Sequence, residues 1–447
     1  MTENPKQKFY FWNKTRYFIL SLTLICMTLG QINSVSFNFT IICMEDLITD
    51  YHLNHSTGLH WMEDPTKKSL IFSGSAIGAI LGLFPAVFLI NRYGIRTTLT
   101  LCGFLSSLSS LLFPLSVSLS YPTVILIRIL EGMSVSAMIT VVTVISANWS
   151  PFSEMGTNLA ILSCFFQLSM IICMPISGFL CESWMGWRSI YYVFGVATAI
   201  FYLFFVIFYQ NDPKNHPRVS DKELELIRKD KLQAEVKATV PYFAILKDPT
   251  VIAAFLSFIG SDIAILLLIL FGPTYLRKVL NFDVIGAGFA SSIPYICSIL
   301  IKLICGRLSD KLTLISLKLR FITFCGLSHV LQAVCLVIMS RTDSRVIAQI
   351  AFTGAITVAG INVMGNVRCV QLRTRQYVHF TMGVATFIGC TISFLTPLVV
   401  GFLCPNNSPE EWSLTFLYAA IIVIIFYIPF PIFTSDQPGP YVVKLIT

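Results

Sequence analysis

Apolar residues in this 447-residue chain gather into about twelve blocks, each long enough to cross a membrane. A helix needs roughly 20 predominantly apolar residues to span the hydrocarbon core, and residues 69–91 and 189–210 form two blocks of that length. A helix also satisfies its backbone hydrogen bonds internally, which a bilayer demands of any spanning segment. The pattern therefore predicts an all-α polytopic membrane protein with twelve transmembrane helices.

A single long polar segment, residues 211–249, divides the apolar blocks six and six. Within it, Ser220-Asp221-Lys222-Glu223 has the spacing of a capping box, which predicts the start of a short surface helix. We predict three parts: an N-terminal six-helix bundle (1–210), a cytoplasmic central loop (211–249), and a C-terminal six-helix bundle with a short cytoplasmic tail (250–447). Two such halves suit a transporter that rocks about a central site, and the layout favours the major facilitator fold.

Composition supports a membrane class, because 55% of the residues are hydrophobic and 12% are charged, against about 25% charged in soluble domains. The basic residues that give the chain its net charge of +8 lie beside the ends of apolar blocks, where a positive-inside bias explains them. We therefore expect the lipid bilayer as a partner and no nucleic acid. Most of the thirteen cysteines lie inside apolar blocks and are expected to pack as small apolar side chains. Among them, Cys181 and Cys404 lie near predicted outer loops and invite a disulfide.

Lysine and arginine place both termini in the cytoplasm, because their clusters all fall on one side when the blocks alternate. The opposite side carries an acidic loop, residues 45–68, with a glycosylation sequon at Asn54, and a second sequon lies at Asn406. Both asparagines are predicted glycosylation sites. The first apolar block, residues 17–43, is too long for a signal peptide and is expected to remain as a helix.

Two short basic motifs follow the second and the eighth apolar blocks: Asn91-Arg92-Tyr93-Gly94-Ile95-Arg96 and Gly306-Arg307-Leu308-Ser309-Asp310-Lys311. Both resemble the cytoplasmic loop signature of the major facilitator superfamily, in which an acidic side chain meets cations and a helix terminus in the outward-open state. Asp310 fits that pattern, whereas an asparagine replaces the acid in the first motif. The alternative is that these are ordinary positive-inside charges at tight turns. The candidate gating residues are Arg92, Gly94, Arg96, Gly306, Arg307 and Asp310.

Further motifs resemble the family of vesicular glutamate transporters, sialin and sodium-phosphate cotransporters. They are Arg128-Ile129-Leu130-Glu131-Gly132, Trp149-Ser150-Pro151, Gly186-Trp187-Arg188, Gly272-Pro273-Thr274-Tyr275-Leu276 and Glu410-Glu411-Trp412. Two other strings, Asn38-Phe39-Thr40-Ile41-Ile42-Cys43-Met44 and Gly260-Ser261-Asp262, look most like the invertebrate members of that family. This resemblance implies secondary transport of small anions, such as phosphate, acidic amino acids or sialic acid, coupled to sodium, protons or membrane potential. It implies no cofactor and a plasma-membrane or vesicular location, and we expect a monomer to suffice.

Arg128 occupies the position of the family's fourth-helix arginine, inside an apolar block. A charge at mid-membrane depth costs about 2.5 to 3.5 kcal/mol on insertion scales, so it is expected to face a cavity or a partner. Its planar guanidinium suits a carboxylate or phosphate. Glu131 lies three residues on, on the same helical face, and is an alternative partner that would simply neutralise it.

Asp262, in the seventh block, is a candidate coupling site, because a carboxylate inside a membrane is costly and can exchange a proton. The alternatives are a salt bridge to Arg128 or another cation, or a position near the outer water layer. The glutamate carriers have other charges where this chain has Ser34, Phe72, Val135 and Gly260. Because those charges are absent, we do not expect glutamate itself to be the substrate. The carboxylate of Asp262 keeps a cationic or neutral substrate as an alternative.

No nucleophile and base pair, metal-spaced cluster or phosphate-binding glycine loop stands out, so we expect neither an enzyme nor a metal site. The leading hypothesis is a secondary anion transporter that works by alternating access. A sensor or scaffold with a transporter fold, which binds a ligand without moving it, remains the competing hypothesis.

Overall fold

The computed structural model describes residues 14–54, 60–151, 154–228, 240–311 and 315–442, and within these ranges every regular element is helical. Ten of the described helical stretches are long and apolar enough to cross a membrane. Two of them, residues 65–119 and 345–403, contain 55 and 59 residues, about twice the length that one crossing needs. Each of these two accounts for a pair of spans, so the prediction of twelve transmembrane helices is confirmed.

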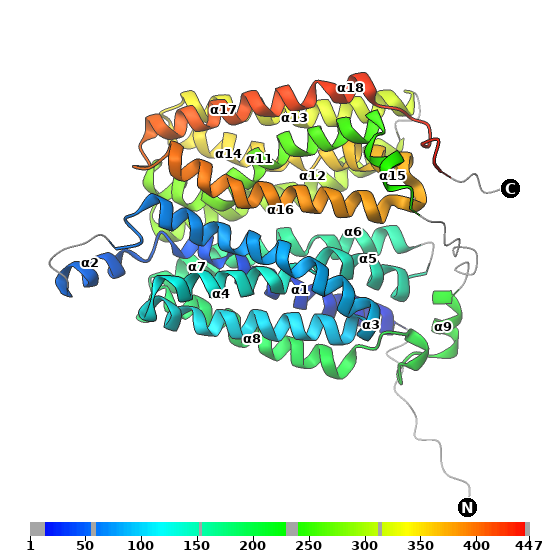
Figure 1. The fold of residues 1–447 in the computed structure, drawn as a ribbon, viewed down its shortest axis with the longest axis horizontal. Helices are drawn as coiled ribbons and strands as arrows, with labels where there is room; N and C mark the ends of the chain where they lie inside the picture. The colour runs from blue at the N-terminus through cyan, green and yellow to red at the C-terminus, as the bar shows by residue number, and fades with distance from the viewer. Residues whose placement is uncertain (1–13, 55–59, 152–153, 229–239, 312–314, 443–447) are drawn as a thin grey trace, which may run out of the picture. The chain divides into compact units, whose positions relative to one another are not determined.

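The first six spans run from α1 to α8 (Figure 1). The second and third are continuous except at Gly94, whose positive φ of 80° breaks the helix between them. The fourth and fifth spans are each made of two consecutive helices. The bounds are α1 (Thr15–Thr40), α2 (Glu45–Asn54), α3 (Pro65–Leu119), α4 (Tyr121–Val135), α5 (Met138–Trp149), α6 (Met155–Ser163), α7 (Phe165–Cys181) and α8 (Arg188–Phe208).

The central polar segment contains a short 3₁₀ turn (Pro213–Asn215), α9 (Asp221–Arg228) and α10 (Tyr242–Leu246). α9 begins directly after Ser220, where the sequence predicts the start of a short helix, and the Ser220 hydroxyl accepts a hydrogen bond from the Glu223 backbone N–H at 3.2 Å.

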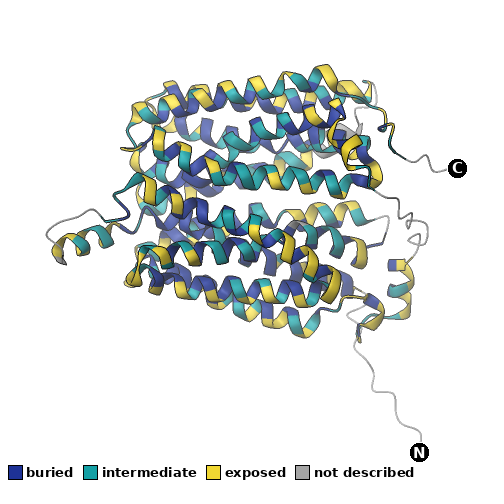
Figure 2. Ribbon diagram, viewed as in Figure 1, coloured by how far each residue is buried: buried dark blue, intermediate teal, exposed yellow. Residues whose placement is uncertain are grey.

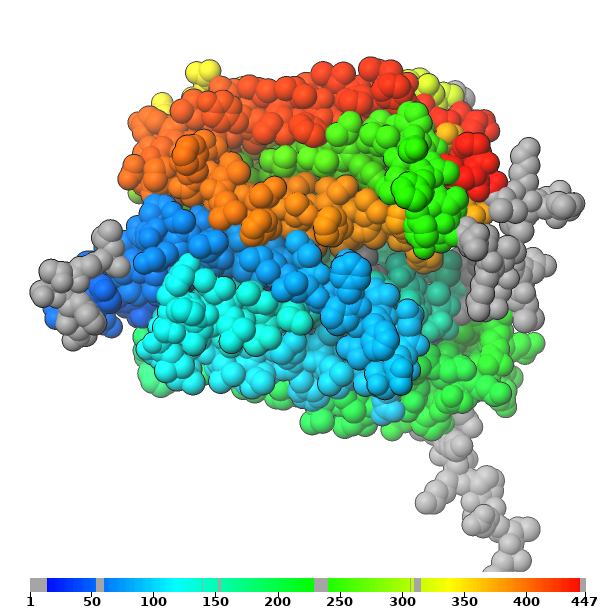
Figure 3. All heavy atoms as spheres, viewed as in Figure 1, coloured from blue at the N-terminus to red at the C-terminus, as the bar shows by residue number. Residues whose placement is uncertain are grey.

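The last six spans run from α11 to α18, and α16 and α17 both lie on the face seen in Figure 3, each packed against α11. The tenth span is interrupted by a π-helical turn and ends in a 3₁₀ turn. The bounds are α11 (Pro249–Lys278), α12 (Val284–Lys311), α13 (Leu317–Arg341), α14 (Arg345–Ala359), the π-turn (Val363–Val367), α15 (Arg368–Thr374), the 3₁₀ turn (Arg375–Tyr377), α16 (Val378–Leu403), α17 (Pro409–Tyr427) and α18 (Pro429–Phe433).

By their contacts, the helices form two compact units. One contains residues 1–34, 77–169 and 188–237, and the other contains residues 35–76, 170–187 and 238–447. The second unit thus includes one end each of α1, α3 and α7. Within it, the Ser73 hydroxyl of α3 donates to the Phe394 carbonyl of α16 at 2.8 Å. The predicted division at residues 211–249 follows the order of the chain rather than these contacts, and it stays a prediction.

Small residues allow the helices of the first unit to approach closely. A Cβ at Gly78 of α3 would meet the Ile129 carbonyl of α4, and one at Gly82 would lie 2.9 Å from the Met133 backbone. Glycine contacts of this kind are a common device for packing helices in membranes, where no hydrophobic force draws them together. Buried and exposed residues alternate accordingly around each helix (Figure 2).

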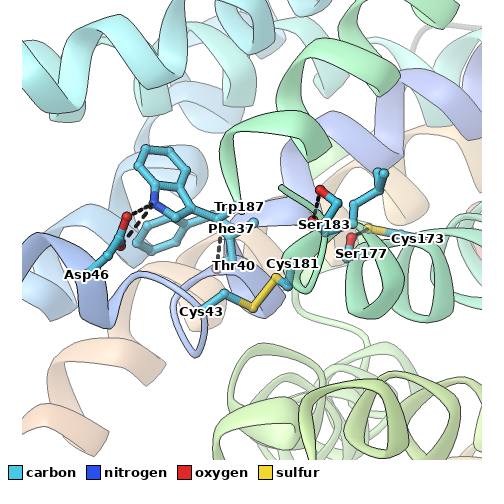
Figure 4. The surroundings of a disulfide bond; sticks show 10 residues. Phe37, Thr40, Cys43, Asp46, Cys173, Ser177, Cys181, Ser183 and Trp187 are labelled. Carbon is cyan, nitrogen blue, oxygen red and sulfur yellow. Dashed lines mark hydrogen bonds between the residues drawn. A yellow bond between two sulfur atoms is a disulfide. The ribbon is translucent and has the colours of Figure 1, made fainter. Parts of the chain in front are cut away.

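The cysteine pairing differs from the predicted one. Cys43 forms the disulfide with Cys181 (Figure 4), while Cys404 is buried and reduced, with its sulfur 3.1 Å from the Thr415 hydroxyl. Cys43 lies in the turn that follows the end of α1 at Thr40, a position that the sequence assigned to the first apolar block. Cys181 ends α7, so this disulfide connects the ends of two spans.

The acidic loop of residues 45–68 also contains structure that hydropathy did not indicate, namely α2. Its first turn carries Glu45 and Asp46, which favour a helix N-terminus. The Asp46 carboxylate accepts a hydrogen bond from the Trp187 indole at 3.1 Å, and Glu45 forms an ion pair with Lys278 of α11. These contacts attach the start of α2 to its own unit.

Candidate functional site

Arg128 and Glu131 form a buried ion pair in the first unit. Both lie on α4 and are almost completely buried, with 1% and 0% of their side chains exposed. The Arg128 guanidinium donates to the Glu131 carboxylate at 2.5 Å and to the Ser34 carbonyl of α1 at 3.0 Å, through the same nitrogen, Nη1. A spacing of three residues places both side chains on one face of the helix. The ion pair with Glu131, which the sequence offered as one alternative for Arg128, is therefore present in the structure.

The carboxylate of Glu131 is only partly satisfied. Its Oε1 atom is buried and has no hydrogen-bond partner in the described part of the chain. A carboxylate has about four acceptor positions, and leaving a buried charged oxygen without a donor is costly. The pair is neutral as a whole. An anion that reaches Arg128 therefore has to compete with a carboxylate in which one buried oxygen lacks a hydrogen-bond donor.

In the same unit, α1 contributes a buried polar side chain that sequence reasoning missed. The Asn33 amide is fully buried and donates to the Ser106 hydroxyl at 2.9 Å and to the Thr198 hydroxyl at 3.0 Å. Its carbonyl oxygen, Oδ1, has no partner among the described atoms. An asparagine inside an apolar block was the available signal. Asn33 and Ser34 thus place two polar groups of α1 in the interior of the unit that holds Arg128.

Asp262 lies in the second unit, half-buried on α11. Its carboxylate faces α16 at Gly389, where an added Cβ would lie 3.6 Å from Oδ2. None of the described residues forms an ion pair or hydrogen bond with the Asp262 side chain. The salt bridge that one alternative expected for Asp262 is therefore not formed with any described residue of its unit.

A buried polar cluster between α11 and α13 was also missed. Ser257 and Ser261 of α11 meet His329 and Gln332 of α13, and all four are at most 3% exposed. The Ser257 hydroxyl lies 3.1 Å from His329 Nε2, and the Ser261 hydroxyl donates to Gln332 at 3.4 Å. The sequence signal was a histidine and a glutamine three residues apart within one apolar block, which places them on one helical face.

Of the candidate gating residues, Arg96 has the best-defined surroundings. Its guanidinium donates to the Val206 carbonyl in the last turn of α8 at 2.6 and 3.1 Å, and its backbone N–H donates to Asn211 at 2.8 Å. A cation at this place satisfies a terminal carbonyl and complements the negative end of the helix dipole. Arg92 lies 5.8 Å from the centre of the Tyr93 ring. Gly94 and Arg96 therefore form a turn that is attached to the end of α8.

The second gating motif, residues 306–311, lies only partly within the described residues. Arg307 is exposed near the end of α12, whereas the side-chain surroundings of Gly306 and Asp310 lie outside the described part. Both sequons remain predictions as well. Asn54 is the last residue of α2, and its side chain and the rest of its sequon fall outside the described residues. Asn406 is exposed, but its amide donates to Glu411 at 3.0 Å.

No group of three or more histidine, cysteine, aspartate or glutamate side chains with the geometry of a metal site occurs in the described ranges.

Comparison with known proteins identifies the fold. The family model described as "Major Facilitator Superfamily" matches residues 20–397. Among solved structures, a bacterial homolog to the human lysosomal transporter Spinster, in an inward-facing and occupied conformation, has a TM-score of 0.72 at 13% identity and covers 95% of this chain and 99% of its own. The xylose transporter XylE from E. coli has a TM-score of 0.69 at 13% identity, with 92% and 98% coverage.

Among curated sequences, vesicular glutamate transporter 2 of Bos taurus is 26% identical over 392 residues, which is 85% of this chain. The chain spans 66% of the length of that relative. Sodium-dependent phosphate transport protein 1 of Oryctolagus cuniculus is 26% identical over 423 residues, covering 92% of this chain and 90% of the relative. The similarity thus extends over most of the chain, at modest identity.

Proposed function

Because the chain belongs to the major facilitator superfamily, we propose that it is a secondary transporter of small organic or inorganic anions that works by alternating access. The two relatives described above are named for the transport of glutamate and of phosphate, both anions, which supports this substrate class. The observation that carries the proposal is the buried Arg128, a permanent cation with a planar fork of donors that matches carboxylate and phosphate oxygens.

Glu131 gives the proposed site its coupling chemistry. The ion pair with Arg128 is neutral, so adding an anion would leave a net negative charge in a low-dielectric interior. If the Glu131 carboxylate takes up a proton as the anion arrives, Arg128 is released to bind the substrate and the site stays neutral. A proton is thus one coupling ion that this geometry accommodates, while sodium or membrane potential remains the alternative.

The remaining candidates have supporting roles in the same proposal. Asp262 is a second coupling position. Arg92, Gly94 and Arg96, with Gly306, Arg307 and Asp310, control the cytoplasmic gate. We further propose that the monomer is the working unit and that it lies in the plasma membrane or a vesicle membrane with both termini in the cytoplasm.

The test is uptake into proteoliposomes, with phosphate and small carboxylic acids as substrates and with pH, sodium and potential gradients imposed one at a time. We compare the wild type with Arg128→Gln and Arg128→Lys, and use Lys318→Gln, which removes an exposed cation from the start of α13, as the matched control. We expect uptake to be lost in Arg128→Gln, reduced in Arg128→Lys, which keeps the charge without the fork, and unchanged in the control.

Two results would contradict the proposal. Folded protein that binds an anion but moves none would favour a sensor or scaffold. Uptake restricted to cationic or neutral solutes, abolished by Asp262→Asn, would move the site to the half-buried carboxylate of α11, and this second candidate rests on the absence of a salt bridge between Asp262 and any described residue of its unit.

A further inference from the structure

His329 lies in the middle of α13, fully buried, with both ring nitrogens held by hydrogen-bonding groups. Its Nδ1 atom lies 2.8 Å from the Cys325 carbonyl, one turn earlier on the same helix. Its Nε2 atom lies 3.1 Å from the Ser257 carbonyl and 3.1 Å from the Ser257 hydroxyl of α11. Both ring nitrogens are thus within hydrogen-bond distance of a backbone carbonyl, which can only accept.

This arrangement suits two protonation states of the ring. In the neutral ring, Nδ1–H donates to the Cys325 carbonyl and Nε2 accepts from the Ser257 hydroxyl. In the imidazolium ion both nitrogens carry hydrogen, and Nε2–H donates to the Ser257 carbonyl instead. The Ser257 hydroxyl is then free to rotate toward the Cys325 sulfur, which lies 3.3 Å away. Each state leaves both ring nitrogens paired, so the exchange of a proton does not create an orphaned buried group.

The surroundings contain few other charges. Tyr427 of α17 stacks on the ring with the ring centres 5.1 Å apart, and Asn362, ahead of the π-turn in the tenth span, accepts from the Cys325 thiol at 3.5 Å. Among the described residues in contact with the ring or its partners, the titratable ones are Cys325, Tyr427 and Cys369, which packs with Cys325 in one buried cluster. The acidic residue of the neighbouring helix, Asp262, faces α16. An imidazolium here would be stabilised by carbonyl dipoles rather than by a counter-ion.

The cluster also reaches a segment where the helix geometry changes. The hydrogen-bond chain runs from His329 through Ser257 and Cys325 to Asn362, and the π-turn begins at the next residue, Val363. π-helical turns inside spans are frequent at functional sites. A rotation of the Ser257 hydroxyl would therefore change the hydrogen bonding of Cys325, whose thiol donates to Asn362 directly before this irregular segment.

We propose that His329 is a proton-binding site of the C-terminal helices, with the Ser257 hydroxyl and carbonyl serving its neutral and charged states in turn. The existence of this site does not depend on which solute is moved. Its coupling to transport rests on the proposed function, and the two claims are tested separately.

The site is tested by solid-state NMR of ¹⁵N-histidine-labelled protein in liposomes, with His329→Gln identifying the signal. Over about pH 8 to 5, the range in which histidine ordinarily titrates, we expect the ring to change from the neutral Nδ1–H tautomer to imidazolium. In Ser257→Ala the neutral ring loses its donor while the cation keeps both carbonyls, so the imidazolium fraction should be larger at each pH. His379→Gln, at an exposed histidine of α16, should leave the His329 signal unchanged.

A ring that keeps one neutral tautomer over the whole range would overturn the proposal, as would an imidazolium fraction that Ser257→Ala leaves unaltered. Coupling is tested by the pH dependence of anion uptake, which should flatten in His329→Gln and persist in His379→Gln. If the wild type moves no anion, the proposed function fails while the NMR result still decides the proton site. If the ring titrates but His329→Gln transports with the wild-type pH profile, the coupling is refuted.

Discussion

Removing one partner of the Arg128–Glu131 pair should destabilise the protein strongly, because both side chains are buried almost completely. At 2.5 Å and an effective permittivity of about 20, the gross attraction between the two charges is about 7 kcal/mol. Much of that attraction offsets desolvation, and the usual net cost of leaving one buried partner alone is about 3 to 5 kcal/mol. Arg128→Gln should therefore lower the melting temperature by about 6 to 20 °C, at about 2 to 4 °C per kcal/mol.

The double variant Arg128→Gln/Glu131→Gln separates folding from transport. It removes both charges, keeps two side chains that can hydrogen-bond, and leaves no unpaired buried ion. We expect it to recover most of the lost stability, since neutral replacement of a buried pair is often close to neutral in free energy. It should nevertheless transport no anion, because the guanidinium is gone.

The assay is thermal unfolding of purified protein in detergent, followed by uptake in proteoliposomes prepared from the same samples. Two outcomes would refute the reasoning. Arg128→Gln as stable as the wild type would show that the buried pair contributes little. A double variant that is both stable and active would show that the pair is structural and that the anion binds elsewhere.

Three further predictions concern other parts of the chain, each measured by thermal unfolding. Gly94→Ala should cost about 1 to 2 kcal/mol or more, because a positive φ is unfavourable for alanine and the new Cβ would contact the Asn211 amide. Cys43→Ser should lower stability by about 2 to 4 kcal/mol by removing the bond to Cys181. Adding a reductant should lower the stability of the wild type and leave that of the variant unchanged. Burial lowers the pKa of the His216 imidazole below its usual 6.5. As the pH falls, this residue therefore takes up a proton in the unfolded chain before it does so in the folded protein. Below about pH 6.5 the wild type should then lose more stability than the His216→Gln variant.

The sequence was sufficient for the spans because their length is a property of the bilayer and needs no tertiary information. It was insufficient for α2, a helix of ten residues in the loop of residues 45–68. That helix begins with two acidic residues and lacks an apolar block, so its stability comes from contacts outside its own sequence. The disulfide was predicted wrongly for a related reason. The end of α1 cannot be located to within a few residues from hydropathy, and Cys43 lies at that boundary.

The same distinction applies to the candidate sites. Glu131 was identified as a partner of Arg128 because a helix fixes the geometry of residues three apart. The Ser34 carbonyl, which shares the same guanidinium, belongs to another helix 94 residues earlier, and no local pattern indicates it. His329 was missed because its partner Ser257 is 72 residues away, and a single histidine in an apolar block is usually an ordinary buried side chain.

Charge balance connects the two proposed sites. In the described structure the Arg128–Glu131 pair is neutral, so a monovalent anion bound there is balanced by one proton on Glu131. Such a cycle carries no net charge across the membrane, and membrane potential alone should not drive it. A proton on His329 that travels with the same anion adds one positive charge per cycle. Uptake of that anion would then respond to potential in the wild type, and the response would disappear in His329→Gln. The dependence of uptake on potential therefore distinguishes a histidine that moves its proton with the substrate from one that only adjusts the cycle to pH.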